Sequence, residues 1–182
     1  APYGDDFAGI GMNPSVDARP RKGVDEWGAE WDNIGVSNLG EVKRAPLADW
    51  ADFGRLAIPD IHKPGRWANL EGAWDRAGDR FLMGWGVSIY ERVHFIRGLE
   101  NTWADIFEAP EDLRRLIDIL VEMNLVAIGQ YAAAGADGYM FGDDWGLQDR
   151  LMISPQAWRS IWKPAYRRIY QAAHEAGLLT FL

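Results

Sequence analysis

The chain of 182 residues carries a formal net charge of −8, and 48% of its residues are apolar. This apolar fraction supports a packed core and excludes a disordered, collagen-like or disulfide-scaffold chain. The acidic balance argues against nucleic acid or an anionic membrane as a partner, although ordinary soluble domains also carry such a charge excess. There is no cysteine, so these residues provide no disulfide, thiol nucleophile or thiolate metal site.

No uninterrupted apolar run approaches the ~18 residues of a membrane span, and no charged segment followed by an apolar one marks a signal peptide. We therefore expect a cytoplasmic protein without a membrane partner, folded as one partial domain over residues 1–182. Both ends resemble interrupted structure, because residues 178–182 have the pattern of a buried strand with nothing after it.

The N-terminal half is irregular. Residues 25–32 and 39–43 are expected to pair as a β-hairpin around residues 35–38, which makes an excursion near residues 25–45. Residues 50–56 have the pattern of a short helix, and the proline-containing segment 58–67 is expected to be a loop.

The second half alternates strands and helices. Residues 80–86 form an apolar run that ends in glycine, and Ser88 and Glu91 have the spacing of a capping box for a helix to about Arg97. After a short helical turn at residues 102–107, Pro110 begins the longest periodic helix, which Gly135 ends.

The same alternation continues to the end of the chain. Residues 138–142 predict a compact strand, and Ser154 and Pro155 begin a helix in which we expect a kink at Pro164. Strand, helix, strand, helix, strand is the pattern of a parallel α/β fold. Periodicity alone does not distinguish a barrel from an open sheet, and a barrel would be incomplete, with about five of its strands present.

The densest polar cluster directly follows the strand at residues 138–142. Asp143 and Asp144 are candidates for proton transfer or substrate binding, because the carboxyl ends of parallel strands carry the active site. The alternative is that one acid caps a loop and the other is solvated. Trp145 and Gln148 in the same loop are candidates for substrate contact.

His94, Tyr90 and Arg97 lie at helical spacing, so one face could present an imidazole, a phenol and a guanidinium to a cleft. A packed, structural histidine is the alternative. Trp27, Trp31 and Trp85 are candidate walls for a flat ligand, although most of the ten tryptophans are expected to pack in the core. The three histidines are too scattered to suggest a metal site.

Several motifs resemble the uroporphyrinogen decarboxylase (URO-D) superfamily, and more narrowly a branch with an Asp-Asp-Trp-Gly turn that is related to corrinoid:thiol methyltransferases. They span nearly the whole chain: residues 25–28, 40–43, 46–50, 91–92, 97–101, 135–148, 151–155, 158–159 and 163–164. The resemblance implies a (β/α)₈ barrel with its substrate cleft at the carboxyl ends of the strands.

The resemblance also implies two chemistries. One is cofactor-free decarboxylation of uroporphyrinogen in porphyrin biosynthesis, and the other is zinc-dependent methyl transfer between a corrinoid protein and a thiol. His94 takes the place of a substrate-contacting tyrosine of the decarboxylases, while Asp143 and Asp144 replace a Ser-His pair. Zinc ligands, where the family has them, would lie beyond Leu182, so no metal ligand is expected within this chain.

Methyl transfer is therefore our leading hypothesis, with a small-molecule or tetrapyrrole-like substrate and a corrinoid protein as the expected partners. A true uroporphyrinogen decarboxylase is the first alternative. A non-catalytic barrel that binds a tetrapyrrole or corrinoid is the second.

Overall fold

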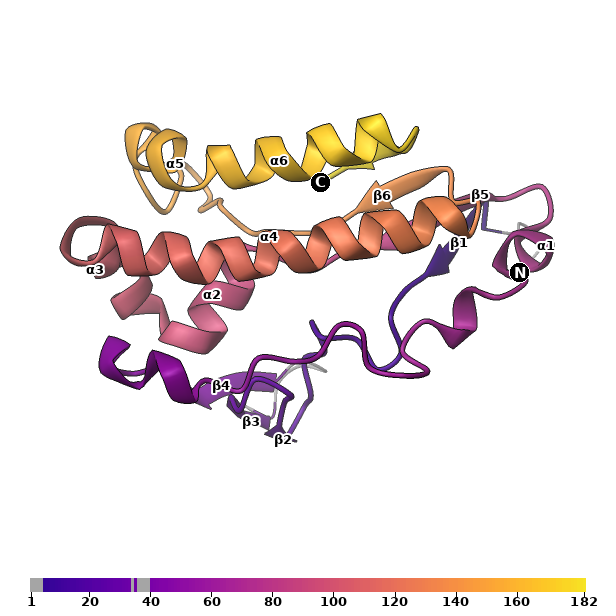
Figure 1. Cartoon of the computed structure of the whole chain (residues 1–182). Helices are drawn as coiled ribbons and strands as arrows, with labels where there is room; N and C mark the ends of the chain where they lie inside the picture. Colours follow the sequence, from indigo (N-terminus) through magenta and orange to yellow (C-terminus); the bar gives the residue numbers. More distant parts are fainter. Residues whose placement is uncertain (1–4, 34, 36–39) are drawn as a thin grey trace.

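The computed structural model describes residues 5–33, 35 and 40–182, which form two separate sheets (Figure 1). The larger sheet is parallel, in the order β1-β5-β6-β7. Its strands are β1 (Phe7–Ile10), β5 (Phe81–Trp85), β6 (Gly138–Met140) and β7 (Leu179–Phe181). The three strands predicted in the second half are all present, and the described residues provide four parallel strands rather than about five.

The smaller sheet is antiparallel and contains the predicted hairpin. It consists of β2 (Gly23–Val24), β3 (Glu30–Asn33) and β4 (Gly40–Arg44). The first hairpin strand begins at Glu30 and not at Asp25, because the Asp25 carboxylate accepts from the amides of Trp27 at 3.0 Å and Ala29 at 2.9 Å and holds a turn there. Apart from Gly35, the predicted connection at residues 35–38 lies outside the described residues.

The predicted helices are present in the predicted order. The helices of the structure are the 3₁₀ helices η1 (Trp50–Arg55) and η2 (Ala68–Leu70), and the α-helices α1 (Ala73–Ala77), α2 (Tyr90–Arg97), α3 (Leu99–Glu108), α4 (Pro110–Ala133), α5 (Pro155–Ile161) and α6 (Lys163–Glu175). Of these, η2 and α1 are additional helices that were not predicted. The expected kink at Pro164 is wrong. The chain forms two helices there, because Pro164 occupies the first turn of α6, where its missing amide hydrogen is not needed.

The capping box predicted at Ser88 is also wrong. The N-cap of α2 is Ile89, which has no side-chain cap of its own. The Ser88 hydroxyl instead donates to the carboxylate of Asp17 at 2.9 Å.

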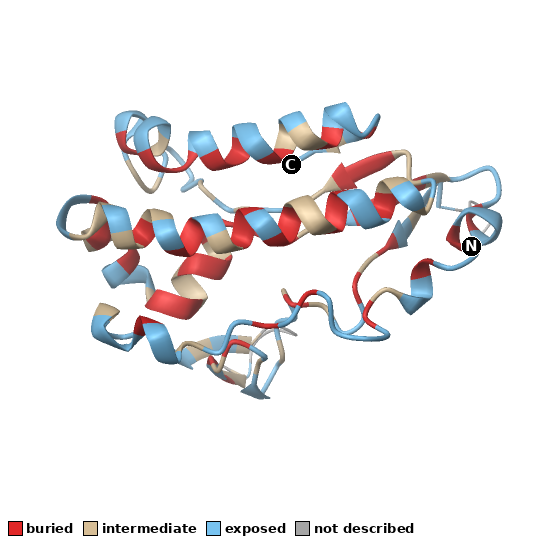
Figure 2. Ribbon diagram, viewed as in Figure 1, coloured by how far each residue is buried: buried red, intermediate tan, exposed pale blue. Residues whose placement is uncertain are grey.

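Helices α4 and α6 cover one face of the parallel sheet (Figures 1 and 2). Leu82 and Tyr139 are buried beneath them, and a side chain at Gly84 would overlap the ring of Tyr131 from α4. Among the described residues, α4 is the one helix that is long and apolar enough to cross a membrane, with a mean hydropathy of 1.4. Half of that apolar window is buried inside the protein, so α4 has the character of a core helix.

The opposite face of the sheet is largely uncovered. Strand side chains alternate between the two faces, and Phe7, Trp85 and Leu179 are 49%, 48% and 60% exposed. Strands β1 and β7 form the two open edges. A twisted parallel sheet with helices on one side and apolar residues on the other is the arrangement of part of a (β/α)₈ barrel, whose inner face the remaining strands enclose.

Candidate functional site

The four parallel strands end at one edge of the sheet, which we call the carboxyl edge. The segments that leave this edge are residues 11–19 after β1, 86–89 after β5 and 141–152 after β6. Ligands of parallel α/β proteins bind at this edge, because the connecting loops converge there. The acidic turn, residues 143–146, is part of the third segment.

The carboxylate of Asp143 accepts hydrogen bonds from backbone amides of the segment that follows β5. Its Oδ2 accepts from the amide of Ile89 at 3.0 Å and its Oδ1 from the amide of Glu91 at 2.9 Å. The Tyr166 hydroxyl of α6 donates to Oδ2. Burial raises the pKa of Asp143 to about 6, and these hydrogen bonds offset that effect only in part.

Trp145 connects the acidic turn to both α2 and α6. Its ring stacks on Tyr90 of α2, with centroids 3.9 Å apart and planes 20° apart. Its Nε1 donates to the Tyr166 hydroxyl at 2.9 Å. Burial, with the Asp143 carboxylate adding to it, raises the pKa of Tyr166, so this hydroxyl remains a donor.

Asp144 differs from its neighbour, because its side chain is exposed. Its Oδ1 accepts from the amide of Gly146 at 3.2 Å, an interaction within the turn itself. Gln148 is exposed in the hairpin-like extension that follows, where Leu147 donates to the carbonyl of Arg150 at 2.7 Å.

An apolar hollow of about 400 Å³ adjoins the acidic turn. It is lined by Trp145, Leu151, Ile153, Pro155, Trp158, Arg159, Tyr166 and Leu182. Aromatic and aliphatic side chains form nearly all of its wall, as in many small-molecule sites. We call it the apolar hollow below.

Trp85 lies at the last position of β5 and on the uncovered face. It aligns with Met140 of β6, which in turn aligns with Phe181 of β7. Its carbonyl accepts from the Tyr131 hydroxyl at 2.6 Å, while its side chain stays half exposed. The indole is therefore placed on the inner face near the carboxyl edge, whereas Trp27 and Trp31, the other two candidate walls, are buried.

His94 faces the second sheet. It lines a hollow of about 450 Å³ together with residues of β4 that include Glu41 and Lys43. Burial, followed by the charges of Arg19 and Arg92, lowers the pKa of His94 to about 4. Its Nδ1 is buried and makes no hydrogen bond within the described part of the chain. The imidazole is therefore neutral at pH 7.

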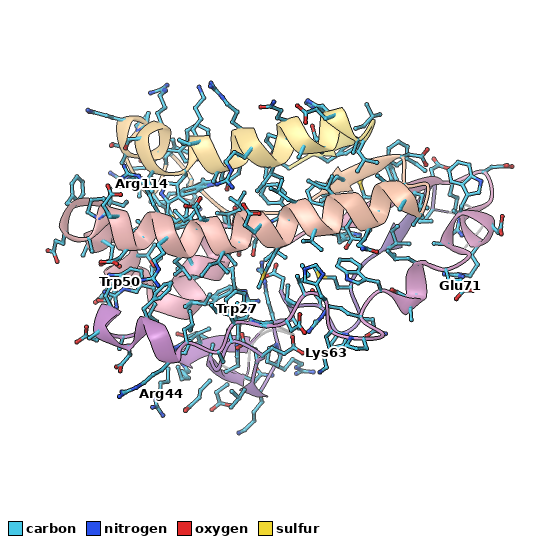
Figure 3. All side chains as sticks on the ribbon, in the orientation of Figure 1. Trp27, Arg44, Trp50, Lys63, Glu71 and Arg114 are labelled. Carbon is cyan, nitrogen blue, oxygen red and sulfur yellow. The ribbon has the colours of Figure 1, made fainter. Side chains whose placement is uncertain are left out.

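Arg97 is buried and its donors are used inside the protein. Its Nε donates to Asp105 Oδ2 at 2.7 Å, and its guanidinium donates to the carbonyls of Leu47 and Ala48. It also lies 4.7 Å from the ring centroid of Trp50, which Figure 3 labels. The structure thus groups Asp143, Asp144 and Trp145, and it places Arg97 in a separate buried cluster.

Sequence reasoning missed a buried ion network at the carboxyl edge. Arg92 is fully buried, and its guanidinium donates to Asp17 at 2.8 Å and Asp25 at 2.7 Å. A signal did exist, because Arg92 lies three residues after Ile89 and four before Ile96, which are both buried on α2. A cation on the buried face of a helix needs acidic partners, and their identity depended on the fold.

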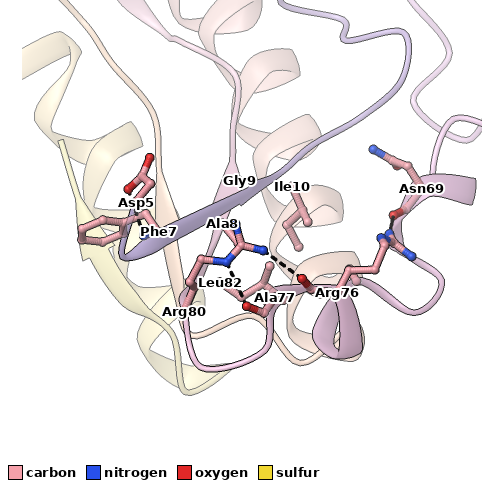
Figure 4. Close-up of a pocket in the computed structure, with 11 residues that line it drawn as sticks. Asp5, Phe7, Ala8, Gly9, Ile10, Asn69, Arg76, Ala77, Arg80 and Leu82 are labelled. Carbon is pink, nitrogen blue, oxygen red and sulfur yellow. Dashed lines mark hydrogen bonds between the residues drawn. The ribbon is translucent and has the colours of Figure 1, made fainter. Parts of the chain in front are cut away.

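A third hollow, of about 400 Å³, lies along the open strand β1 (Figure 4). Arg76 and Arg80 line it, and they donate to backbone carbonyls, including those of Glu71 at 2.6 Å and Ala77 at 2.9 Å. The hollow extends along β1 and the start of β5, not along the carboxyl edge. We therefore assign no ligand to it.

No group of three His, Cys, Asp or Glu side chains that could hold a metal ion occurs within residues 5–33, 35 and 40–182. The described side chains therefore do not by themselves fit the zinc ion that the resemblance implies for methyl transfer.

Comparison with known proteins identifies the class. The family model described as "Uroporphyrinogen decarboxylase (URO-D)" matches residues 82–181, which is more than half of the chain. The chain therefore belongs to the uroporphyrinogen decarboxylase family. A search of curated proteins finds no match.

A solved structure described as "methyltransferase from Methanosarcina mazei" has a similar fold, with a TM-score of 0.55 and 18% sequence identity. The match covers 85% of this chain and 46% of that one. The chain thus spans about half the length of its structural neighbour. With the open parallel sheet, these findings show an incomplete (β/α)₈ barrel of the URO-D type.

Proposed function

We propose that the protein is a URO-D-like barrel enzyme that transfers a methyl group between a corrinoid and a thiol or a related acceptor. The observation that carries this proposal is the exposed carboxylate of Asp144 at the carboxyl edge, next in the chain to Trp145, which lines the apolar hollow. A corrinoid protein is the proposed partner. The family and the methyltransferase-like fold support this assignment.

The charges at the carboxyl edge favour methyl transfer over decarboxylation of uroporphyrinogen. A substrate that carries many carboxylates needs cations that can pair with it. Here Arg92 is paired with Asp17 and Asp25, and Arg19 donates to Glu91 at 3.0 Å and 2.9 Å. These two guanidinium groups are already neutralised, so they are not free to pair with the carboxylates of uroporphyrinogen.

The proposed reaction is a displacement at carbon. A thiolate sulfur would attack the methyl group of the methylcorrinoid substrate, so that a sulfur–carbon bond would form while the cobalt–carbon bond would break with its electron pair left on cobalt. Binding and orientation are the roles that the described residues can fill. The apolar hollow would exclude water from the methyl group, and Asp144 would accept a hydrogen bond from the ligand.

The test uses the full-length protein with methylcobalamin and 2-mercaptoethanesulfonate in the presence of zinc ions. Loss of the methylcobalamin absorbance together with a methylated thiol in the mass spectrum is the expected result. A parallel anaerobic incubation with uroporphyrinogen tests for decarboxylated products by chromatography. Decarboxylation without methyl transfer would overturn the proposal, and so would corrinoid binding without turnover of either substrate.

A further inference from the structure

The two neighbouring acids of the acidic turn have different surroundings. Both carboxylate oxygens of Asp143 accept hydrogen bonds from other parts of the fold, whereas Asp144 is exposed and bonds to an amide of its own turn. This contrast suggests different roles for two residues that the sequence could not distinguish.

Asp143 supplies what the N-terminus of α2 lacks. The first amides of a helix have no partner within the helix, and a negative charge there is stabilising. Ile89 cannot cap with its side chain, and Asp143 accepts from its amide and from that of Glu91. A second carboxylate, Asp17, accepts from the amide of Ser88 at 3.2 Å.

The same carboxylate also connects α2 to α6. Tyr166 donates to Asp143 and accepts from Trp145 Nε1, so Asp143 and Trp145 share one hydroxyl on α6. Trp145 stacks in addition on Tyr90, the first residue of α2. Asp144 lies between two residues that are each fixed to both helices.

We propose that Asp143 is a positioning residue that anchors the acidic turn to α2 and α6, and that Asp144 is the carboxylate presented to the ligand. The role of Asp144 rests on the function proposed above, but the anchoring by Asp143 does not. The ligand would place an apolar body in the apolar hollow and direct an N–H or O–H donor to Asp144. Asp143 would act only through the position of its neighbour.

Residue-resolved hydrogen exchange on the full-length protein tests the anchoring. In Asp143→Asn the side chain keeps one acceptor oxygen, so exchange at the amides of Ile89 and Glu91 should accelerate by about tenfold at one or both, the size expected for loss of a helix cap. The amide of Ser88, which Asp17 holds, is the internal control and should not change. Asp144→Asn should leave all three amides unchanged.

Tyr166→Phe is the second variant, in case Asp143→Asn does not fold. This variant removes the hydroxyl to which both Asp143 and Trp145 bond, so hydrogen exchange in the acidic turn should accelerate. Exchange at the amides of Ile89 and Glu91 should also accelerate, but less than in Asp143→Asn. Unchanged exchange at both amides in Asp143→Asn, or faster exchange there in Asp144→Asn, would overturn the anchoring.

Kinetics with the methyl donor and thiol then separate the two roles. Asp144→Asn should lower kcat/KM with the three amides still protected, whereas Asp143→Asn should lower it only together with faster exchange at Ile89 and Glu91. Loss of kcat/KM in Asp143→Asn with all three amides protected would overturn the positioning role. Exchange needs no turnover, so a failed methyl-transfer assay and a failed anchoring result remain distinguishable.

Discussion

Trp145 lies flat on Tyr90, with ring centroids 3.9 Å apart and planes inclined by only 20°. One residue follows β6 and the other begins α2, so the stack joins the connections of two neighbouring strands at the carboxyl edge. Trp145 also contacts Trp162 in an edge-to-face arrangement, at a centroid distance of 5.2 Å. The indole is therefore a fixed wall of the apolar hollow, and the turn that carries it is fixed as well.

Removing this stack should destabilise the fold. We expect Trp145→Ala to lower the free energy of unfolding by about 2 kcal/mol, because the variant loses both the stacking on Tyr90 and the apolar area that the indole buries. Trp145→Phe should lose less than half of that, since it keeps a ring on Tyr90. Leu147→Ala, at a 53% exposed position nearby, is the control. Urea unfolding of the full-length protein measures all three, and equal stability of Trp145→Ala and the parent would contradict the stack's role.

The raised pKa of Asp143 predicts a specific pH dependence. Its pKa rises from the usual 3.8 to about 6, so the folded protein holds this proton more tightly than the unfolded chain does. The contribution of Asp143 to stability should therefore fall as pH rises from about 4 to about 6, and it should be level above that range. The difference in unfolding free energy between the parent and Asp143→Asn isolates this effect. A difference that grows in favour of the parent over the same pH range would reverse the predicted sign.

The lowered pKa of His94 predicts the opposite pH dependence of stability. Its pKa falls from the usual 6.5 to about 4, so the folded state resists protonation of the imidazole. Its contribution to stability is complete above pH 6.5 and should be lost as pH falls toward 4. Nuclear magnetic resonance titration of the ring should show neutral His94 at pH 6. A midpoint for His94 at or above the usual 6.5 would exclude the buried, neutral state.

The network around Arg92 should be essential for folding. Arg92→Met removes the buried cation that bridges Asp17 and Asp25, and we expect a loss of about 3–5 kcal/mol because both carboxylates lose this charge partner and keep only their other hydrogen bonds. Arg44→Ala is the matched control, since Arg44, labelled in Figure 3, pairs with Glu30 at an exposed site. It should change stability by no more than about 0.5 kcal/mol. Thermal unfolding compares the two, and a similar small effect for both would show that the network is dispensable.

Local sequence patterns were sufficient for most of the parallel sheet. The glycine-bounded apolar runs correspond to β5 and β6, and Pro110 begins α4 as predicted. Pro164 was misjudged because the residues alone do not show whether a proline lies inside a helix or in its first turn. The expected strand at residues 25–32 was predicted to begin too early, since the Asp25 side chain stabilises a turn at Trp27 and β3 begins only at Glu30.

The candidate site was harder to predict because its key contacts join distant segments. Asp143 accepts a hydrogen bond from the amide of Ile89, 54 residues away in the sequence. No local sequence pattern indicates such a pair. The Ser88-Glu91 spacing suggested a local cap, but Ser88 bonds to Asp17 instead. The strand-end position of the two acids was correctly predicted, whereas their division into a partly buried, hydrogen-bonded carboxylate and an exposed one required the fold.

The role of Asp144 provides the most direct test of the account. We expect Asp144→Asn in the full-length protein to lower kcat/KM for methyl transfer by at least about tenfold with an unchanged Tm, because the exposed carboxylate serves the ligand and not the fold. Asp149→Asn, at an exposed position five residues further along the same segment, is the matched control and should retain parental kinetics. Parental kinetics for Asp144→Asn as well would contradict the claim that the acidic turn presents its carboxylate to a ligand.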